Sequence, residues 1–483
     1  MDQTRYAQRR ATFMERLGDT IAIVPAGRHQ ARNGDVAHAF RQNSDFFFLT
    51  GFPEPESVAI FDPSHPTEQY TLFVRPRDPE MESWNGRRAG VDGAVEQYAA
   101  NAAHTLDELD EWLRRRLVGR STIGYTHGSP GSDRVLDALK TARAHSRRAG
   151  VTTPETIIDP RAVLHEMRLY KSSEEIEALR KACHISAVAH TEAMRFTRPG
   201  LNERQVQAAV EYVFAVMGAE RVGYGSIVAG GPNATILHYV ENDQPLRDGE
   251  LLLIDAGAEY RHLTADITRT FPVNGEFTTP QRALYELVLD AERQVIDLCA
   301  PGLAYSEMHE KAVDVLSHGL VDLGLLPGSG DEAIEKGWYR EFFFHGTGHW
   351  LGIDVHDAGA YKIDGEGRKL EPSMTFTVEP GIYVAPEKTS VALSSAPYDP
   401  QEAMRLSYEL GAAEAKAEFA RRTEEAGSTS FEVPAEFLGI GIRVEDDILI
   451  TSDGHENLSS GVPTGLAEIE AICGEDSDLP LFS

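Results

Sequence analysis

The most constraining feature of this chain is a set of acidic residues placed in or beside segments that are otherwise fit for burial. The apolar run Leu251–Ile254 ends at Asp255, and Asp266 follows inside a second strand-like run, Ala265–Val273. A hairpin of this length would bring both carboxylates to one face of a sheet. Burying two like charges costs several kcal/mol unless cations neutralise them. The pair therefore points to bound cations, although either aspartate alone would be explained as a turn-capping residue.

A glycine-rich segment further along holds three histidines, His345, His349 and His356, in the sequence FHGTGHWLGIDVHD. Glycines allow close approach of the backbone, which suits a loop wrapped around a compact site. A lone histidine is more often structural. Three of them beside an aspartate favour metal binding or acid–base chemistry.

Two glutamates extend this pattern. Glu379 ends the β-like run in TVEPGIY, and Glu445 lies in GIRVEDDILI, where alternation with period two puts Arg443 and Glu445 on one face. Each glutamate alone would be a strand-end or half-solvated carboxylate. Together, four carboxylates and one histidine form an oxygen-rich donor set that suits Mn²⁺ or a similar divalent ion better than a Cys/His zinc site. Four carboxylates exceed the needs of one ion, so the set predicts two ions roughly 3.5 Å apart that activate a water for hydrolysis.

The chain has 483 residues, which is too long for one ordinary core and predicts two domains. Residues 1–160 mix strand-like and helix-like runs, which predicts an α/β N-terminal domain. The strands are expected at Thr20–Pro25, Ser57–Phe61 and Tyr70–Val74, and a helix at Ala102–Leu117.

Residues 161–483 predict an α+β domain with several capped helices. A capping box at Ser172–Glu175 opens a helix that stops at Pro199, and Asn202 opens a helix to Met217. Two more helices are expected, from Thr279 as N-cap to Pro301, and over Ser306–Leu323. Strands are expected at Ser226–Val228, Glu250–Ala256, Ala265–Val273, Thr375–Val384 and Gly439–Thr451. Residues 388–436 are rich in Ala and Glu and predict a helical insertion closed by a linker at Gly427–Ser430.

Composition excludes several classes of partner. The net charge of −30 repels nucleic acid and anionic membranes. No apolar run approaches the ~20 residues that cross a bilayer. The polar N-terminus lacks the apolar core of a secretory signal. Three widely spaced cysteines, Cys183, Cys299 and Cys473, indicate reduced thiols, so a cytoplasmic location is expected.

These motifs, in this order, resemble the pita-bread metallopeptidases, and aminopeptidase P most closely. The resemblance rests on HGTGHWLGIDVHD, TVEPGIYVAP, GIGIRVEDDILIT, GGPNATILHY and NSDFFFLTGF, and it covers essentially the whole chain. It implies a pita-bread C-terminal domain and an enzyme that removes the N-terminal residue from peptides with proline in second position. The nucleophile would be a hydroxide between two divalent ions, with Mn²⁺ the favoured metal.

The resemblance also implies a role for each matching residue. Asp255 would hold one metal, Asp266 and Glu445 would bridge both, and His349 and Glu379 would complete the other. Glu379 would also take the proton of the nucleophile. The other residues implied are His238 and His356 for holding substrate and stabilising the oxyanion, His345 for the proline pocket, Tyr383 and Arg443 beside the metals and the bound substrate, and Asp45 for reading the free amine of the substrate.

The N-terminal domain would narrow the cleft and make oligomer contacts in a dimer or tetramer. Two alternatives stay open. Prolidases, which act on Xaa-Pro dipeptides, can carry extra sequence between the motifs of Glu379 and Glu445, as this chain does. A non-catalytic peptide-binding member of the fold would be expected to lose metal ligands.

Overall fold

The computed structural model describes residues 3–477 and 479, and contacts divide it into two compact units after Arg168. The N-terminal unit is built on a six-stranded sheet of order β6-β5-β4-β1-β7-β8. β4 is antiparallel to both of its neighbours, β1 and β5, and the other pairings in this sheet are parallel. The strands of this sheet are β1 (Ile21–Pro25), β4 (Val58–Phe61), β5 (Tyr70–Val74), β6 (Ala102–Thr105), β7 (Thr122–Tyr125) and β8 (Thr156–Ile158). The predicted α/β class of this unit is confirmed.

Helices and a small ribbon complete this part of the chain. They are α1 (Gln3–Leu17), β2 (Ala31–Asn33), β3 (Val36–Ala37), α2 (Ser44–Thr50), α3 (Pro79–Asn85), α4 (Gly90–Tyr98), α5 (Leu109–Arg116), α6 (Ser132–Ala149) and α7 (Arg161–Leu169).

The helix predicted over Ala102–Leu117 is wrong in its first half. Residues 102–105 form β6, which pairs in parallel with β5, and the helix α5 begins only at Leu109. Thr105 and Glu108 form a capping box that turns the chain from strand to helix. Pairing with a buried strand has therefore overridden the helix propensity of the alanines.

The C-terminal unit contains the predicted helices. They are α8 (Ser173–Phe196), α9 (Glu203–Val216), α10 (Thr279–Leu298) and α11 (Tyr305–Asp322), with shorter α12 (Gly330–Glu335) and α15 (Leu466–Cys473). Ser172 and Asn202 cap α8 and α9 as predicted, each in a capping box. For α10 the N-cap is Thr278, one residue earlier than predicted, because Gln281 completes the box from the third helical position.

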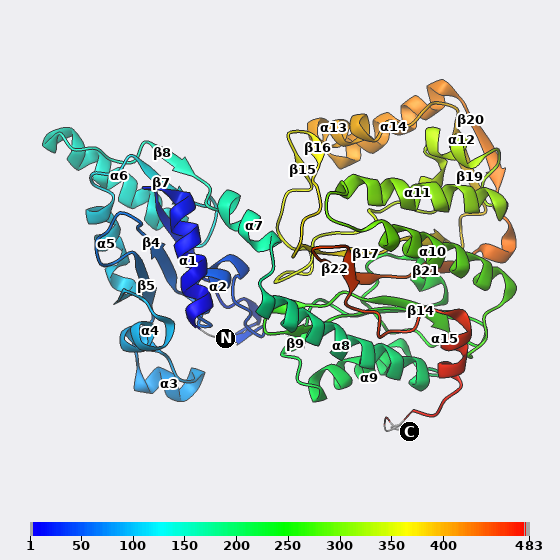
Figure 1. Cartoon of the computed structure of the whole chain (residues 1–483), viewed down its shortest axis with the longest axis horizontal. Helices are drawn as coiled ribbons and strands as arrows, with labels where there is room; N and C mark the ends of the chain where they lie inside the picture. Colours follow the sequence, from blue (N-terminus) through cyan, green and yellow to red (C-terminus); the bar gives the residue numbers. More distant parts are fainter. Residues whose placement is uncertain (1–2, 478, 480–483) are drawn as a thin grey trace. The chain divides into compact units, whose positions relative to one another are not determined.

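The strands lie between two helix pairs (Figure 1). Helix α8 packs beside α9 and against β12 and β13, while α10 packs beside α11 and against β17, β18 and β21. The sheets are β10-β11-β14, β13-β12-β9, β17-β22-β23 and β18-β21, all antiparallel, with a small β15-β16 ribbon. Their bounds are β9 (Arg221–Val222), β10 (Ile227–Gly230), β11 (Leu251–Asp255), β12 (Ala258–Tyr260), β13 (Leu263–Thr264), β14 (Thr268–Pro272), β15 (Lys362–Ile363), β16 (Glu366–Gly367), β17 (Thr375–Val378), β18 (Gly381–Val384), β21 (Ile440–Arg443), β22 (Asp446–Ile450) and β23 (His455–Asn457).

The insertion is a helical hairpin carried on a β-ribbon. Helices α13 (Pro400–Leu410) and α14 (Ala412–Ala426) stand between β19 (Ser390–Ser394) and β20 (Ser428–Glu432), which pair with each other. The predicted linker at Gly427–Ser430 is thus wrong, since most of it belongs to β20. The ribbon is anchored by the Trp338 indole, which donates to the Ser394 carbonyl at 2.8 Å.

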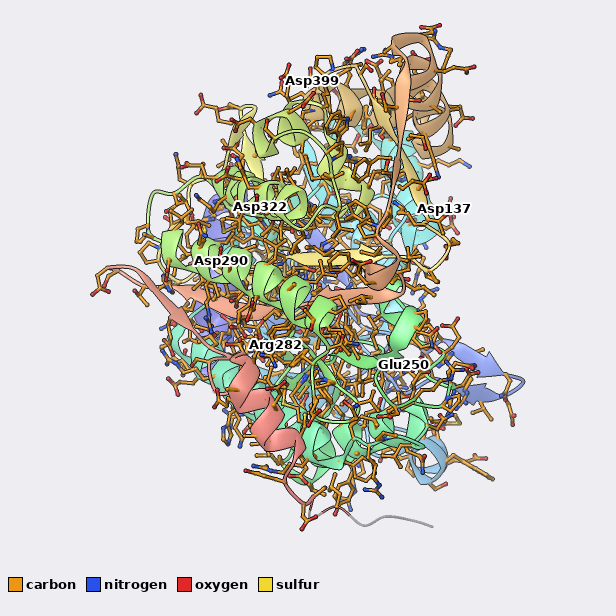
Figure 2. All side chains as sticks on the ribbon, turned by 90° about the vertical axis from the view of Figure 1, so that its right-hand side faces the viewer. Asp137, Glu250, Arg282, Asp290, Asp322 and Asp399 are labelled. Atoms are coloured by element: carbon orange, nitrogen blue, oxygen red, sulfur yellow. The ribbon has the colours of Figure 1, made fainter. Side chains whose placement is uncertain are left out.

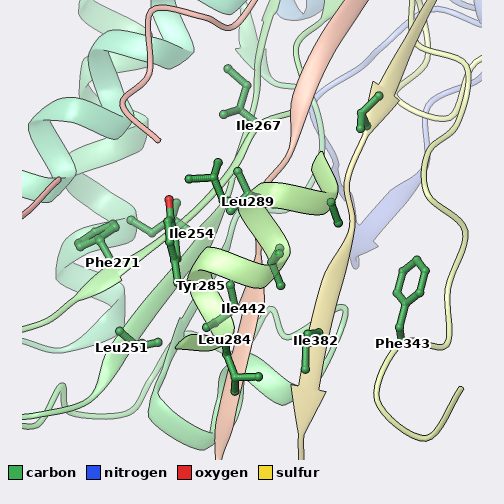
Figure 3. Close-up of a cluster of buried hydrophobic side chains, with 14 of the residues drawn as sticks. Leu251, Ile254, Ile267, Phe271, Leu284, Tyr285, Leu289, Phe343, Ile382 and Ile442 are labelled. Atoms are coloured by element: carbon green, nitrogen blue, oxygen red, sulfur yellow. The ribbon is translucent and has the colours of Figure 1, made fainter. Parts of the chain in front are cut away.

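One large apolar core fills the C-terminal unit (Figure 3). Leu251 and Ile254 of β11, Leu284 and Leu289 of α10, and Ile442 of β21 meet there. Each such side chain contributes about 1.5–3 kcal/mol through burial. Strands whose apolar faces are fixed by this core hold their polar residues in fixed register.

The surface of the molecule is strongly acidic. Asp290, Asp322 and Asp399 are among its exposed carboxylates (Figure 2). None of the helices in the described residues is both long and apolar enough to cross a membrane.

The core makes a first prediction. Leu284→Ala should lower the free energy of unfolding by about 2–5 kcal/mol, because a fully buried α10 side chain leaves a cavity against the sheet. Urea unfolding followed by circular dichroism measures the change. Tyr408→Ala is the control, because Tyr408 is 92% exposed and should change stability by less than ~0.5 kcal/mol. Equal effects of the two substitutions would contradict this view of the core.

Candidate metal centre

The five predicted donors come from five separate places in the C-terminal unit. Asp255 ends β11, Asp266 precedes β14, His349 lies in the loop before β17, Glu379 follows β17, and Glu445 lies between β21 and β22. All five line one cleft, which has an empty volume of about 730 Å³. The convergence expected from the sequence is therefore present.

Strand register explains how Glu379 and Glu445 meet. β17 pairs with β22, which places Val378 opposite Asp446. β18 pairs with β21, which places Gly381 opposite Arg443. Continued through the gap, the same register puts Glu379 opposite Glu445. An isolated bridge between Thr268 and Glu445 then joins this hairpin to β14. Two ribbons with apolar faces buried elsewhere thus direct their carboxylates to one point.

The glycine-rich loop reaches β17 only because it lacks a side chain at Gly348. A Cβ atom there would lie 1.9 Å from the Thr377 carbonyl oxygen. The backbones of His349 and Thr377 are hydrogen-bonded, and the His349 N–H also contacts the Thr377 hydroxyl at 3.0 Å. This close approach sets the imidazole of His349 against the carboxylates.

The donor atoms lie within bonding reach of common ions. His349 Nε2 is 3.2 Å from Asp266 Oδ2 and 3.7 Å from Glu379 Oε1. Asp266, His349 and Glu445 each offer one donor atom within 4.8 Å of the others. Arg443 Nη2 lies 2.5 Å from Asp255 Oδ2, and the Thr268 hydroxyl donates to Glu445 at 2.5 Å.

Burial and mutual repulsion govern the charges of these groups. Burial, and then the charges of Asp266 and Glu379, raise the pKa of Glu445 well above its usual range. Burial raises the pKa of Glu379 to about 7, and it also raises that of Asp266. Burial alone would lower the pKa of His349, but its hydrogen bond to Asp266 raises the pKa to about 9.

Four carboxylates thus share a site in which Arg443, and His349 while it is protonated, are the cations close enough to offset their charge, among residues 3–477 and 479. The remaining negative charge is what divalent cations would neutralise, and oxygen donors with one imidazole suit Mn²⁺, Zn²⁺ and related ions. The residues present therefore fit a pair of divalent ions.

A second cluster, made by His345, Tyr383 and Arg443, adjoins the same cleft, which His345 and Arg443 line. Tyr383 OH lies 2.9 Å from His345 Nε2 and accepts a hydrogen bond from Arg443 at 3.0 Å. Burial, and next the charge of Arg443, lower the pKa of His345 to about 3, so its ring is neutral at pH 7. His238 and His356 also line the cleft, and the rings of His349 and His356 are 4.1 Å apart.

Asp45 lies in the other unit, on α2, where its carboxylate is 2.8 Å from Arg168 Nη1 and 3.4 Å from His165 Nε2. Burial acts to raise its pKa, but these two partners keep the pKa below its usual value. Its part in substrate binding stays a prediction.

Sequence reasoning missed Tyr224, whose hydroxyl donates to Asp255 Oδ1 at 2.6 Å and also contacts Asp266. It also missed Thr268, which contacts both Glu445 and Arg443. The signal for Tyr224 is a glycine on each side. A Cβ atom at Gly223 would lie 2.1 Å from Thr264 Cγ2, so this glycine lets the segment pass close to β13. Thr268 carried no signal of its own, because threonine is common in strands.

A cleft whose candidate donor set is four carboxylates and one histidine, set on paired antiparallel ribbons between two helix pairs, defines a metal-dependent hydrolase of pita-bread architecture. The chain belongs to metallopeptidase family M24. The model of that family matches residues 177–452, and the model of the aminopeptidase P N-terminal domain matches residues 6–124.

Individual relatives agree over nearly the full length. The chain is 40% identical to Xaa-Pro aminopeptidase of Escherichia coli (strain K12), with 98% of each chain covered. It is similar to the structure of Pseudomonas aeruginosa aminopeptidase PepP, with 43% identity, 98% coverage of both chains and a TM-score of 0.87. It is also similar to zinc-substituted Escherichia coli aminopeptidase P in complex with product, with 39% identity, 98% coverage of both chains and a TM-score of 0.86.

The donor set makes a second prediction. His349→Ala should lower the number of Mn²⁺ ions retained per chain after gel filtration, because it removes the one nitrogen donor next to Asp266 and Glu379. Elemental analysis of the protein measures this. His318→Ala, which removes an exposed histidine of α11, should leave the metal content unchanged. Full occupancy in the His349 variant would remove that residue from the ligand set.

Proposed function

We propose that this chain is an Xaa-Pro aminopeptidase that uses two divalent ions to hydrolyse the bond between an N-terminal residue and a following proline. The observation that carries the proposal is that the five donors line one cleft together with His345 and Arg443, which Tyr383 joins by hydrogen bonds. Membership of family M24 and near full-length similarity to aminopeptidase P supply the reaction class.

The geometry supports an assignment of the ligands. Asp266 and Glu445 would be shared by both ions, since each has donor atoms close to the other and to His349. His349 and Glu379 would complete one site, and Asp255 the other. We assign Mn²⁺ as the metal, because four of the five donors are hard oxygens.

When bound, the ions would supply an acidified water and polarise the scissile carbonyl. Glu379 would take the proton from that water, because its carboxylate lies among the other donors, with Oε1 3.7 Å from His349 Nε2. It would then deliver the proton to the proline nitrogen, which leaves as a secondary amine.

His238 and His356 would act on the substrate itself. Burial, and then the charge of His349, lower the pKa of His356, so its ring is neutral at pH 7 and can donate one N–H to a developing oxyanion. His238 is exposed on the loop after β10, where it can approach an incoming peptide.

The proposed proline specificity follows because the pocket does not require a peptide N–H at the scissile bond. An Xaa-Pro bond has no N–H, and its ring fixes the direction of the chain. The neutral ring of His345, held by Tyr383, offers a flat surface for the pyrrolidine ring. Asp45 would recognise the free amine of the substrate.

A cytoplasmic dimer or tetramer belongs to this proposal. The three cysteines are free thiols, two of them buried, which fits a reducing compartment. The non-catalytic alternative has no support, since all five donors are retained. The near full-length similarity to Xaa-Pro aminopeptidase favours that activity over prolidase, and the peptide length that is cleaved tests the choice.

A third prediction concerns Glu379. Glu379→Ala should lower kcat by about 10²–10⁴-fold, because it removes the proton acceptor, while the circular dichroism spectrum stays that of the parent. Stopped assays on an Xaa-Pro-Xaa tripeptide with added Mn²⁺ measure the rate. The control Glu387→Ala removes an exposed carboxylate at the start of the insertion and should keep full activity. Near-normal turnover in the Glu379 variant would refute its role as base.

A fourth prediction concerns the substrate. With Mn²⁺ present, peptides of three or more residues that begin Xaa-Pro should be cleaved after the first residue, and matched Xaa-Ala peptides should not. Chromatographic detection of the free N-terminal amino acid measures cleavage. Activity confined to dipeptides would instead identify a prolidase.

A further inference from the structure

The two carboxylates assigned to both ions, Asp266 and Glu445, belong to different strand segments. The bridge between Thr268 and Glu445 brings these segments together, with the Glu445 N–H donating to the Thr268 carbonyl at 3.1 Å. One backbone bond cannot by itself fix both carboxylates. The Thr268 hydroxyl also contacts the Glu445 carboxylate. Two buried side chains that do not line the cleft, Asp447 and Arg269, make further connections between the two segments.

Asp447 holds the peptide that carries Asp266. Its Oδ2 accepts the Asp266 N–H at 3.0 Å and a hydrogen bond from Cys183 Sγ at 3.2 Å, and its own N–H donates to Ser459 at 2.9 Å. The side chain is 0% exposed, and its Oδ1 has no hydrogen-bond partner within residues 3–477. A carboxyl group buried this deeply is costly. Its contacts with two distant segments indicate a positioning role.

Arg269 holds the peptide that carries Glu445. Its Nη1 donates to the Glu445 carbonyl at 2.8 Å and to the Thr268 carbonyl at 2.9 Å. Its Nη2 pairs with Asp446 at 2.6 Å. It donates further to the carbonyls of Val462 and Pro463, each at 3.1 Å. This fully buried guanidinium therefore ties β14 to Glu445 and to the segment before α15.

The two connections are reciprocal. Arg269, three residues after Asp266, donates to the Glu445 carbonyl. Asp447, two residues after Glu445, accepts the Asp266 N–H. Neither side chain can bind an ion in the cleft, because neither lines it. Both act on backbone groups next to the donors, as supporting residues of metal sites commonly do.

We propose that Asp447 and Arg269 are positioning residues that fix the distance between the Asp266 and Glu445 carboxylates and so set the affinity of the centre for divalent ions. This inference rests on the proposed two-metal function. It assigns the role of Asp447 to hydrogen-bond acceptance at one oxygen and not to its charge.

That distinction gives a sharp test. Asp447→Asn keeps the size of the side chain and an amide oxygen that can accept from Asp266, whereas Asp447→Ala removes the acceptor. With Mn²⁺ as probe, isothermal titration calorimetry on the full chain should give affinity within about 3-fold of the parent for Asp447→Asn. For Asp447→Ala the affinity should fall by about 10–100-fold, the range typical of supporting residues. Visible absorption of the Co²⁺-loaded protein should shift in the alanine variant and not in the asparagine variant.

Leu284→Ala is the matched control for lost stability, because it creates a cavity in α10 without touching either connection. It should bind Mn²⁺ as the parent does. If Asp447→Ala does not fold, the Arg269→Lys variant is tested in its place. Its ammonium group keeps the positive charge beside Asp446 but cannot donate to all five partners of Arg269. Its Mn²⁺ affinity should also fall by about 10-fold or more.

The outcomes separate the two proposals. A parent protein that binds no Mn²⁺ and cleaves no Xaa-Pro peptide would defeat the proposed function. An active parent whose Asp447→Ala or Arg269→Lys variant keeps parental Mn²⁺ affinity and Co²⁺ spectrum would overturn the positioning role alone. A loss of affinity in Asp447→Asn equal to that in Asp447→Ala would also overturn it, because charge and not acceptance would then matter.

Discussion

The mutual repulsion of four carboxylates at one buried point is the constraint on which the rest of this structure depends. Repulsion between their charges favours separation of these side chains, and the folded chain holds them together in one cleft. They are Asp255, Asp266, Glu379 and Glu445. The raised pKa values of three of them express the cost, since each charged form is disfavoured by burial and by its neighbours. The apolar core beneath the strands supplies the free energy that keeps them in place, and bound cations would remove the repulsion.

The scaffold meets this constraint with strand register. The two ribbons that pair β17 with β22 and β18 with β21 are interrupted at the same level, so Glu379 and Glu445 face each other. The pairing of β11 with β14 presents the aspartates from the other side. The cluster of His345, Tyr383 and Arg443 is joined to the charged centre, because Arg443 contacts both Tyr383 and Asp255. The His345–Tyr383–Arg443 cluster and the charged centre are therefore coupled through one guanidinium.

The sequence predicted the candidate donors that line the cleft because charges within apolar strand-like runs are conspicuous, and it predicted the capped helices because capping boxes are local. It could not predict contacts whose partners are far apart in the chain. Tyr224 and Asp447 have ordinary local surroundings and acquire their roles only when distant segments pair. The strand β6 was mistaken for helix for the same reason, since its pairing with β5 is not visible in its own residues.

The claim most open to direct measurement is that the five donors hold two divalent ions. Anomalous X-ray diffraction from crystals grown with Mn²⁺, recorded at the manganese absorption edge, locates such ions without reference to activity. The account predicts two anomalous peaks in the cleft, with Asp266 and Glu445 contacting both. Peaks elsewhere in the molecule, or a cleft in which these carboxylates contact no manganese, would contradict it.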